Sequence, residues 1–244
     1  MTLAVPGRRP VAEALRAGRR LHEVLVARED RGDLAELAAQ ARAAGVPVRT
    51  ADRRRLDDLA GGVVHQGVVA LAPDFGYVDL ARLADGDLVV ALDGVTDPHN
   101  LGAIARSAEA AGAAGLVLPK RRSAHVTPAA EKAAAGAFSW LPVALVPNLA
   151  RALADLADAG YWSVGLAGDA DEALWDSTLL DGRVVVVVGA EGRGLSRLVA
   201  ERVDGRVAIP QAGRIGSLNA SAAAAVALFE VRRRRARMGV AGHG

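Results

Sequence analysis

The sequence of 244 residues contains no cysteine, 3% aromatic residues and two lysines, Lys120 and Lys132. Without cysteine, disulfides, thiolate nucleophiles and thiolate-ligated zinc or iron–sulfur sites are excluded, and we expect no metal cofactor. The sequence has no uncharged run of about 18 apolar residues, so we expect no membrane span. The N-terminus has no unbroken apolar stretch of the kind found in secretory signals. We therefore expect a soluble, cytoplasmic protein.

The charges nearly balance, with 30 Lys and Arg against 28 Asp and Glu and a net charge of +2. Residues 1–72 hold 12 Arg against 9 acids, a balance of +3, whereas the remaining residues hold 18 basic against 19 acidic groups, a balance of −1. This abundance of arginine could serve phosphate recognition. Because Ala and Arg are abundant together, a genome whose composition favours Ala and Arg codons is the better explanation.

The first third of the chain predicts a small α/β domain, residues 1–72. We expect strands at 21–27, 46–50 and 68–72, with helical segments at 33–44 and 52–60. The segment Pro73–Tyr77 (PDFGY) breaks this pattern and marks a boundary. We place a linker at 73–78 and a second, larger domain at 79–244, which suits usual domain sizes.

Strands and helices alternate in the larger domain, which predicts a parallel sheet with helices on both faces. Val184–Val188 is a run of valines typical of a strand that is covered on both sides. Because ligands bind at the carboxyl ends of such strands, we expect the ligand site in the loops after Leu92, Val188 and Ala208. The expected strands are 88–92, 115–118, 141–145, 161–166, 184–188 and 205–208, and the expected helices are 100–111, 128–135, 148–159 and 195–202.

The loop after Leu92 leads into a predicted helix that carries Asn100 and Arg106. Asp97 is a suitable N-cap, and Pro98 fits the first turn, where a missing N–H costs nothing. Asn100 and Arg106 are six residues apart and so lie on different faces of this helix. Taken alone, Arg106 is explained as a solvated helix residue and Asn100 as a secondary cap.

The loop after the valine strand reads Gly189-Ala190-Glu191-Gly192-Arg193-Gly194. Its three glycines let the backbone approach a ligand closely and direct N–H groups toward it. Glu191 occupies the third position, so the loop does not match the dinucleotide-binding pattern G-x-G-x-x-G. Asp204 is only an imperfect candidate for the acidic ribose partner. The sequence therefore disfavours a nicotinamide oxidoreductase.

The third loop spans Ile209–Ser221 and opens the last predicted helix. Ser217 is a natural N-cap for that helix. Residues 220–229 are almost all small and apolar, which indicates a helix that packs in the core, at a subunit interface, or both.

Together the three segments resemble the three motifs of the SpoU/TrmH family of SPOUT RNA 2′-O-ribose methyltransferases. N-x-G-x-x-x-R spans Asn100–Arg106, G-x-E-x-x-G spans Gly189–Gly194, and the Ile-Pro and Ser-Leu-Asn-x-Ser elements lie within Ile209–Ser221, in the family's order. Gly7–Leu15 and His65–Ala70 resemble the small N-terminal domain of the branch that modifies large-subunit ribosomal RNA. The resemblance covers nearly the whole chain.

This resemblance implies an α/β fold of the SPOUT type, a parallel sheet with a deep C-terminal trefoil knot. It also implies a small N-terminal α/β domain that is similar to a ribosomal protein and binds RNA. S-adenosyl-L-methionine is expected among the knotted loops, held mainly by the backbone of Gly189, Ile209 and Leu218. The family works as homodimers, so the catalytic pocket is expected near a subunit interface.

The implied reaction transfers a methyl group from a sulfonium to a ribose 2′-hydroxyl, with Arg106 at the centre and Asn100, Glu191, Ser217 and Asn219 around it. A guanidinium stays protonated in proteins and is a poor base. We therefore expect Arg106 to hold the adjacent RNA phosphate and stabilise the nascent alkoxide. Three candidates for the proton acceptor follow from this resemblance: the phosphate, a water molecule and Arg106 itself. Glu191 is expected to hold Arg106 or the first-motif loop, and Ser217 and Asn219 to shape the substrate pocket.

The expected substrate is a guanosine of 23S ribosomal RNA, because the separate N-terminal domain favours ribosomal over transfer RNA. The alternatives are a tRNA guanosine methyltransferase, a ribosomal adenosine methyltransferase that confers antibiotic resistance, and an RNA-binding module without activity.

The tryptophans and the arginine run near the C-terminus are expected to have structural roles. Trp140, Trp162 and Trp175 are expected in the core or an interface, and Arg232–Arg235 at the negative end of the last helix.

Overall fold

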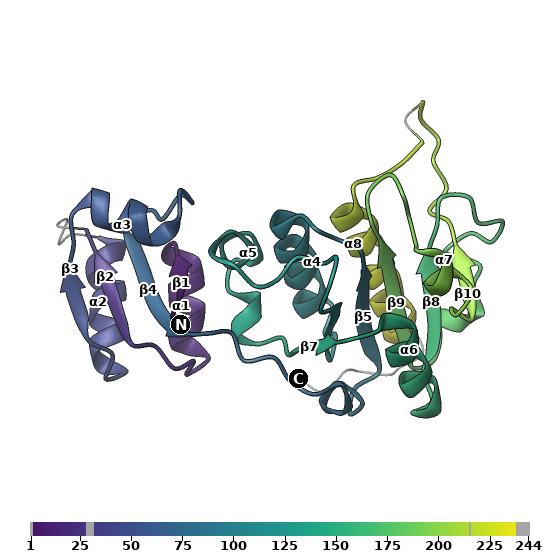
Figure 1. Cartoon of the computed structure of the whole chain (residues 1–244), viewed down its shortest axis with the longest axis horizontal. Helices are drawn as coiled ribbons and strands as arrows, with labels where there is room; N and C mark the ends of the chain where they lie inside the picture. The colour runs from purple at the N-terminus through teal and green to yellow at the C-terminus, as the bar shows by residue number, and fades with distance from the viewer. Residues whose placement is uncertain (1, 28–31, 215, 238–244) are drawn as a thin grey trace.

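The computed structural model describes residues 2–27, 32–214 and 216–237, which form two sheets in separate parts of the chain (Figure 1). The N-terminal part holds a four-stranded sheet in the order β1-β4-β2-β3, antiparallel except for the parallel pair of β2 and β3. Its elements are β1 (Thr2–Pro6), α1 (Arg8–Arg16), β2 (Glu23–Val26), α2 (Asp33–Ala43), β3 (Val48–Thr50), α3 (Arg53–Ala60) and β4 (Val68–Pro73).

The larger part holds a six-stranded sheet in the order β10-β8-β9-β5-β6-β7, in which every strand pair is parallel, as predicted. Its strands are β5 (Leu88–Asp93), β6 (Gly115–Pro119), β7 (Val143–Val146), β8 (Trp162–Leu166), β9 (Val184–Gly189) and β10 (Gly205–Val207). Its helices are α4 (Pro98–Ala110), α5 (Pro128–Ala134), α6 (Leu149–Asp158), α7 (Arg197–Ala200) and α8 (Ala220–Arg237), with short turns η1 (Leu80–Leu83), η2 (Ala137–Ser139) and η3 (Thr178–Leu180).

The five valines of β9 explain how the sheet is covered. Val184, Val186 and Val188 belong to the core that packs against α4 and α8, whereas Val185 and Val187 belong to the core beneath α6 and α7. All five side chains are buried. A strand with no polar face is required here because helices cover both sides of the sheet.

Two expectations about the helices need correction. The helix predicted at 195–202 is only the four-residue α7. The last helix begins at Ala220, so its cap is not Ser217 but Asn219, whose Oδ1 accepts a hydrogen bond from Ser221 N at 2.8 Å. Of the two places expected for the tryptophans, the core is wrong, since Trp140, Trp162 and Trp175 are 51%, 52% and 45% exposed. The prediction for Asp97 is confirmed, because its side chain caps α4 through His99 N.

The arginines at the end of α8 hold the fold together. Arg234 pairs with Asp181 at 2.8 Å and donates to the Trp175 carbonyl at 2.6 Å, and Arg235 donates to the Asp87 carbonyl at 2.8 Å. These bonds tie the end of the helix to the loops that precede β5 and β9. The predicted position of Arg234 and Arg235 at the end of the last helix is confirmed, and the structure adds these tertiary contacts.

The two parts of the chain contact each other through α1 and the α5–η2 segment. The Arg19 guanidinium forms an ion pair with the fully buried Glu131 carboxylate at 2.7 Å, and Trp140 Nε1 donates to Glu13 Oε2 at 3.2 Å. Leu3 of β1 packs into the core of the larger part. The N-terminal domain is therefore docked on the larger one by both polar and apolar contacts.

Candidate active site

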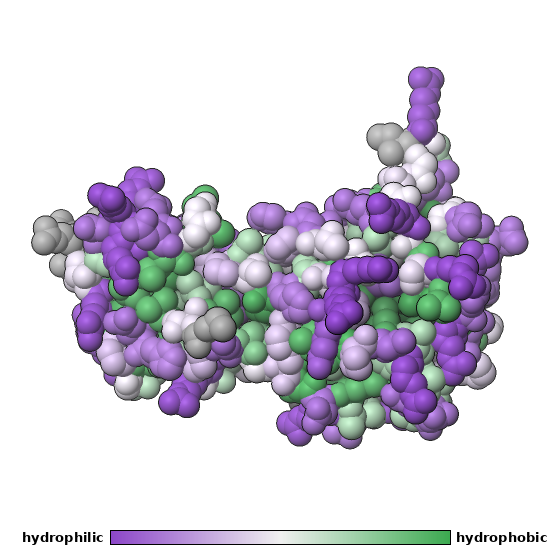
Figure 2. All heavy atoms as spheres, in the orientation of Figure 1, coloured by the Kyte–Doolittle hydropathy of each residue, from purple (hydrophilic) through white to green (hydrophobic). Residues whose placement is uncertain are grey.

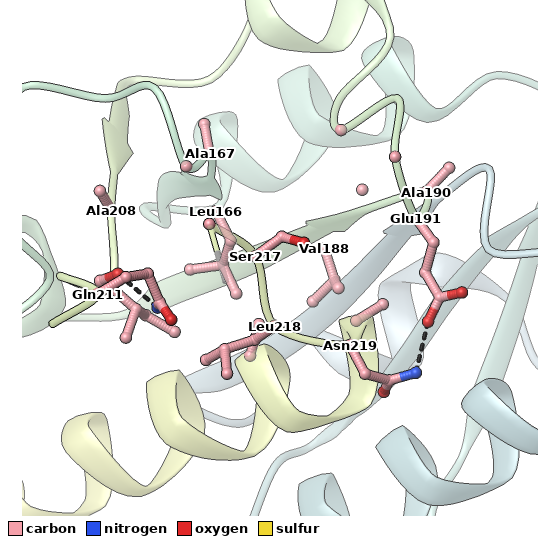
Figure 3. A pocket seen from close by; sticks show the side chains of 18 of the residues that line it. Leu166, Ala167, Val188, Ala190, Glu191, Ala208, Gln211, Ser217, Leu218 and Asn219 are labelled. Atoms are coloured by element: carbon pink, nitrogen blue, oxygen red, sulfur yellow. Dashed lines mark hydrogen bonds between the residues drawn. The ribbon is translucent and has the colours of Figure 1, made fainter. Parts of the chain in front are cut away.

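The ends of β8, β9 and β10 border a cavity at the carboxyl edge of the sheet. Its volume is about 660 Å³, and Figure 3 shows the loops after the three strands and the start of α8 around it. The predicted residues that line it are Gly189, Glu191, Ile209, Ser217, Leu218 and Asn219. The position agrees with the general rule for ligand sites in parallel sheets. Two of the three motifs thus meet in one cavity.

The wall formed by Gly189 has no room for a side chain. A Cβ at this position would lie 2.3 Å from the carbonyl carbon of Gly194 and 2.7 Å from Leu195 N. The approach is close because the loop doubles back, with paired backbone hydrogen bonds of 3.0 and 2.9 Å between Ala190 and Gly194. Gly194 itself has a φ of 63°, which favours glycine.

Three polar side chains, one from each motif, form a cluster beside the cavity. Asn100 Nδ2 donates to Glu191 Oε1 at 3.1 Å, and Asn219 Nδ2 donates to Asn100 Oδ1 at 3.0 Å and also to Glu191 Oε1. Figure 3 shows the side chains of Glu191 and Asn219 pointing toward each other. Asn100 is buried, and the other two are exposed toward the cavity side. The cluster holds the three motif segments in a fixed relation.

Arg106 lies apart from this cluster in the chain. Asn100 is on the buried face of α4, whereas Arg106 is exposed on another face and lines a notch of about 130 Å³ together with Arg9 and Trp140. Glu191 therefore contacts Asn100 on the first-motif helix and not Arg106. Of the two expectations for Glu191, only the contact with the first motif is present in the single chain.

Sequence reasoning missed the loop after β8, where Leu166, Ala167 and Gly168 also line the cavity. The sequence offered one signal for it, a small Ala-Gly pair at a strand end. It also missed Gln211, whose Nε2 donates to the Ile209 carbonyl at 2.8 Å and so fixes the loop after β10. That loop projects from the body of the larger part in Figure 1, and Figure 2 shows its tip as hydrophilic.

The cavity suits a ligand with an apolar ring and several polar groups. Its volume lies in the usual range for small-molecule sites, about 300–1,000 Å³. Leu166, Val188 and Leu218 supply apolar surface, and the glycine-rich loop supplies backbone groups. Among the described residues, no group of three or more His, Asp or Glu side chains is placed to hold a metal ion. No helix in the described ranges has the length and apolarity needed to cross a membrane.

The chain belongs to the SpoU rRNA methylase family, whose model matches residues 87–229, and residues 4–78 match the model described as RNA 2′-O ribose methyltransferase substrate binding. Among curated relatives, the 23S rRNA (guanosine-2′-O-)-methyltransferase RlmB of Photobacterium profundum is 43% identical over 88% of this chain and 91% of the relative. An uncharacterized tRNA/rRNA methyltransferase of Mycobacterium avium is 45% identical over 96% of this chain and 78% of the relative. The crystal structure of the SpoU methyltransferase AviRb from Streptomyces viridochromogenes in complex with AdoMet is similar with a TM-score of 0.80 at 29% identity, over 97% of this chain and 91% of that one.

Proposed function

We propose that the protein transfers a methyl group from S-adenosylmethionine to the ribose 2′-hydroxyl of a guanosine in 23S ribosomal RNA. The observation that carries this proposal is the cavity at the ends of β8, β9 and β10, which adjoins the cluster of Asn100, Glu191 and Asn219. The name of the RlmB relative supports guanosine of 23S rRNA over the tRNA and adenosine alternatives. Because the proposed substrate is ribosomal RNA, we also propose that the protein acts in the cytoplasm.

The residues around the cavity fit S-adenosylmethionine. The apolar side chains of Val188 and Leu218 would cover the adenine, and the backbone of Gly189, Ile209 and Leu218 would bind its polar edges. Gly189 fits this role because a side chain there would fill space that the backbone already occupies. The bound cofactor supplies an electrophilic methyl group on a sulfonium.

The polar cluster would orient the ribose rather than act as a base. Glu191 accepts hydrogen bonds from two amides, and Asn219 Oδ1 accepts from Ser221 N and from Ser221 Oγ at 2.6 Å. These bonds fix the carboxylate and the amides before a substrate arrives, which limits reorganisation during the reaction. Ser217, on the same cavity wall, would complete the ribose pocket.

Arg106 would reach the reaction from the other subunit of a homodimer. In one protomer Arg106 lies on a different face of α4 from Asn100, so a second copy is needed to bring a guanidinium to the cluster. The helix α8, which packs against α4, exposes Val226 at 38% and Phe229 at 49%. These neighbours on one helix face supply an apolar contact for the partner. Arg106 would there bind the RNA phosphate and stabilise the developing alkoxide.

The proposal also covers the domain boundaries and a knot in the backbone. Residues 1–72 would bind the RNA, 73–78 would link the domains, and 79–244 would catalyse the reaction. We also propose that the C-terminal segment forms the trefoil knot of this family, since α8 packs back against α4 and β9 after the loop of β10. A crystal structure whose backbone path between residues 79 and 237 has no C-terminal segment threaded through a loop of the chain would contradict the knot.

The experiment uses tritium-labelled S-adenosylmethionine with 23S rRNA and, in parallel, with tRNA. We expect label in 2′-O-methylguanosine of the rRNA only. Arg106→Ala should abolish transfer and leave cofactor affinity nearly unchanged, and loss of cofactor binding would contradict the role of Arg106. If Arg106 acts across the dimer, mixing inactive Arg106→Ala and Asn219→Ala proteins should restore part of the activity, because mixed dimers contain one intact site. Deletion of residues 1–72 should weaken RNA binding more than cofactor binding.

A further inference from the structure

A second cavity of about 640 Å³ lies at the same edge of the sheet, between the loops that follow β5, β6 and β9. It continues into the polar cluster through a smaller hollow of about 290 Å³, which shares Gly94, Thr96 and Arg193 with it. The smaller hollow is also lined by Asn100 and Glu191. The two cavities therefore adjoin, and the smaller one borders the proposed reaction site.

The rim of this cavity carries three exposed arginines, Arg121, Arg122 and Arg193. Within the described ranges, none of the three has a hydrogen bond or ion pair with another side chain. The acid that lines the cavity, Asp93, accepts a hydrogen bond from Ser196 N at 2.5 Å. The cavity therefore presents an excess of positive charge without paired carboxylates, which favours an anionic ligand.

The backbone at Arg122 supports a functional reading of this rim. Arg122 has a φ of 58°, in the left-handed region that residues with a side chain rarely adopt. Such a conformation is strained and tends to occur where a side chain must be placed for function. A glycine would adopt this turn without strain but would lose the guanidinium.

The floor of the cavity is apolar. Leu149, Leu195 and Leu198 line it, and Leu198 is 59% exposed. Arginines around an apolar floor match the two parts of a nucleotide, because phosphate binds guanidinium groups and a base can lie on an apolar or planar surface. A protein helix laid in this groove would leave the three guanidinium groups without partners unless it were strongly acidic.

We propose that this arginine groove, formed by Arg121, Arg122, Arg193 and the leucine floor, binds the single-stranded nucleotides that flank the methylated one. The inference rests on the proposed function, because the groove leads to the site assigned there. Phosphates contact Arg121, Arg122 and Arg193, and a flanking base lies over Leu149 and Leu198. The groove thus positions the RNA strand, and the polar cluster receives the target ribose.

The test compares Arg121→Ala/Arg122→Ala/Arg193→Ala with the control Arg151→Ala, which removes an arginine that pairs with Asp155 outside the groove. The probes are a 23S rRNA transcript and a single-stranded RNA oligonucleotide, with affinity measured at several salt concentrations. For single strands the slope of log K against log salt changes by about 0.7 per phosphate contact. The triple variant should therefore lose about 2 from that slope and raise KM for RNA at least tenfold, with kcat and cofactor Kd unchanged.

Replacing all three arginines by lysine should retain most of the slope of log K against log salt, since lysine keeps the charge. The melting temperature of each variant reports whether it is folded. An unchanged slope and KM in a folded, active triple variant would overturn the inference. If the wild-type protein binds the oligonucleotide with the expected slope but methylates no RNA, the groove stands and the proposed function fails. If the triple variant keeps its RNA affinity and loses binding of another protein, the groove is a protein-docking site and the inference is wrong.

Discussion

Replacing Gly189 by alanine should weaken cofactor binding more than the same change at Gly168, which lines the same cavity. The added Cβ would lie 2.3 Å from the Gly194 carbonyl carbon, 2.5 Å from its oxygen and 2.7 Å from Leu195 N. All three are backbone atoms, which cannot move aside as the end of a long side chain can. Relief requires the loop 189–194 to shift, and this loop forms one wall of the cavity.

The expected size of the effect follows from the cost of overpacking. Adding a methylene to a well-packed region costs about 1–3 kcal/mol. If the loop relieves this strain by leaving its binding geometry, the same amount is lost from cofactor affinity. Since 1.4 kcal/mol is a factor of ten, Kd for S-adenosylmethionine should rise roughly fivefold to 140-fold.

The assay is titration calorimetry with S-adenosylmethionine, and the matched control is Gly168→Ala. Gly168 lines the same cavity, but an added Cβ there would meet no atom within 4 Å. The control should therefore bind the cofactor with an affinity close to wild type. A folded Gly189→Ala protein with unchanged Kd would refute the reasoning, as would a control that loses affinity to the same extent.

Three further predictions concern stability and assembly. Arg19→Ala leaves the buried Glu131 carboxylate, whose pKa is raised by burial, without its partner. The free energy of unfolding in urea should therefore fall by about 3–5 kcal/mol at neutral pH, and this loss should shrink as the pH falls and the carboxyl is protonated. Equal stability of the variant and the wild type at neutral pH would contradict this. Hydrogen bonds from Arg233, and then from Arg234, lower the pKa of Glu230 from its ordinary 4.5 to about 2. Its stabilising effect is therefore complete above pH 4.5 and lost as the pH falls through about 2, and thermal unfolding of Glu230→Gln should lack this part of the acid dependence. Phe229→Glu should produce monomers in analytical ultracentrifugation and lose methyl transfer, whereas an active monomer would argue against a composite site.

Local patterns predicted most of the strands and helices because single physical requirements fixed them. The run Val184–Val188 has no polar face, and only a strand between two layers of helices satisfies it. Asp97 followed by Pro98 marks a helix start, and α4 begins there. The first elements, β1 and α1, were outside these patterns, because β1 pairs with the distant β4 and gains its stability from that contact.

The parts that failed depend on tertiary contacts that spacing does not contain. Ser217 and Asn219 are both good N-cap residues, and Asn219 takes the position because α8 must begin where Asn219 meets Asn100 and Glu191. Trp140 was expected in the core or an interface, and the spacing could not show which; its indole donates to Glu13 at the contact between the two domains. The spacing of Asn100 and Arg106 did indicate that they lie on different faces of one helix, and the structure confirms this difference in exposure.

The most direct test is to map 2′-O-methylated riboses in ribosomal RNA from cells with and without this gene. The account predicts that one methylated guanosine of 23S rRNA disappears when the gene is absent and returns with the wild-type protein, but not with Arg106→Ala. An unchanged rRNA methylation map, or a lost methyl group in tRNA alone, would contradict it.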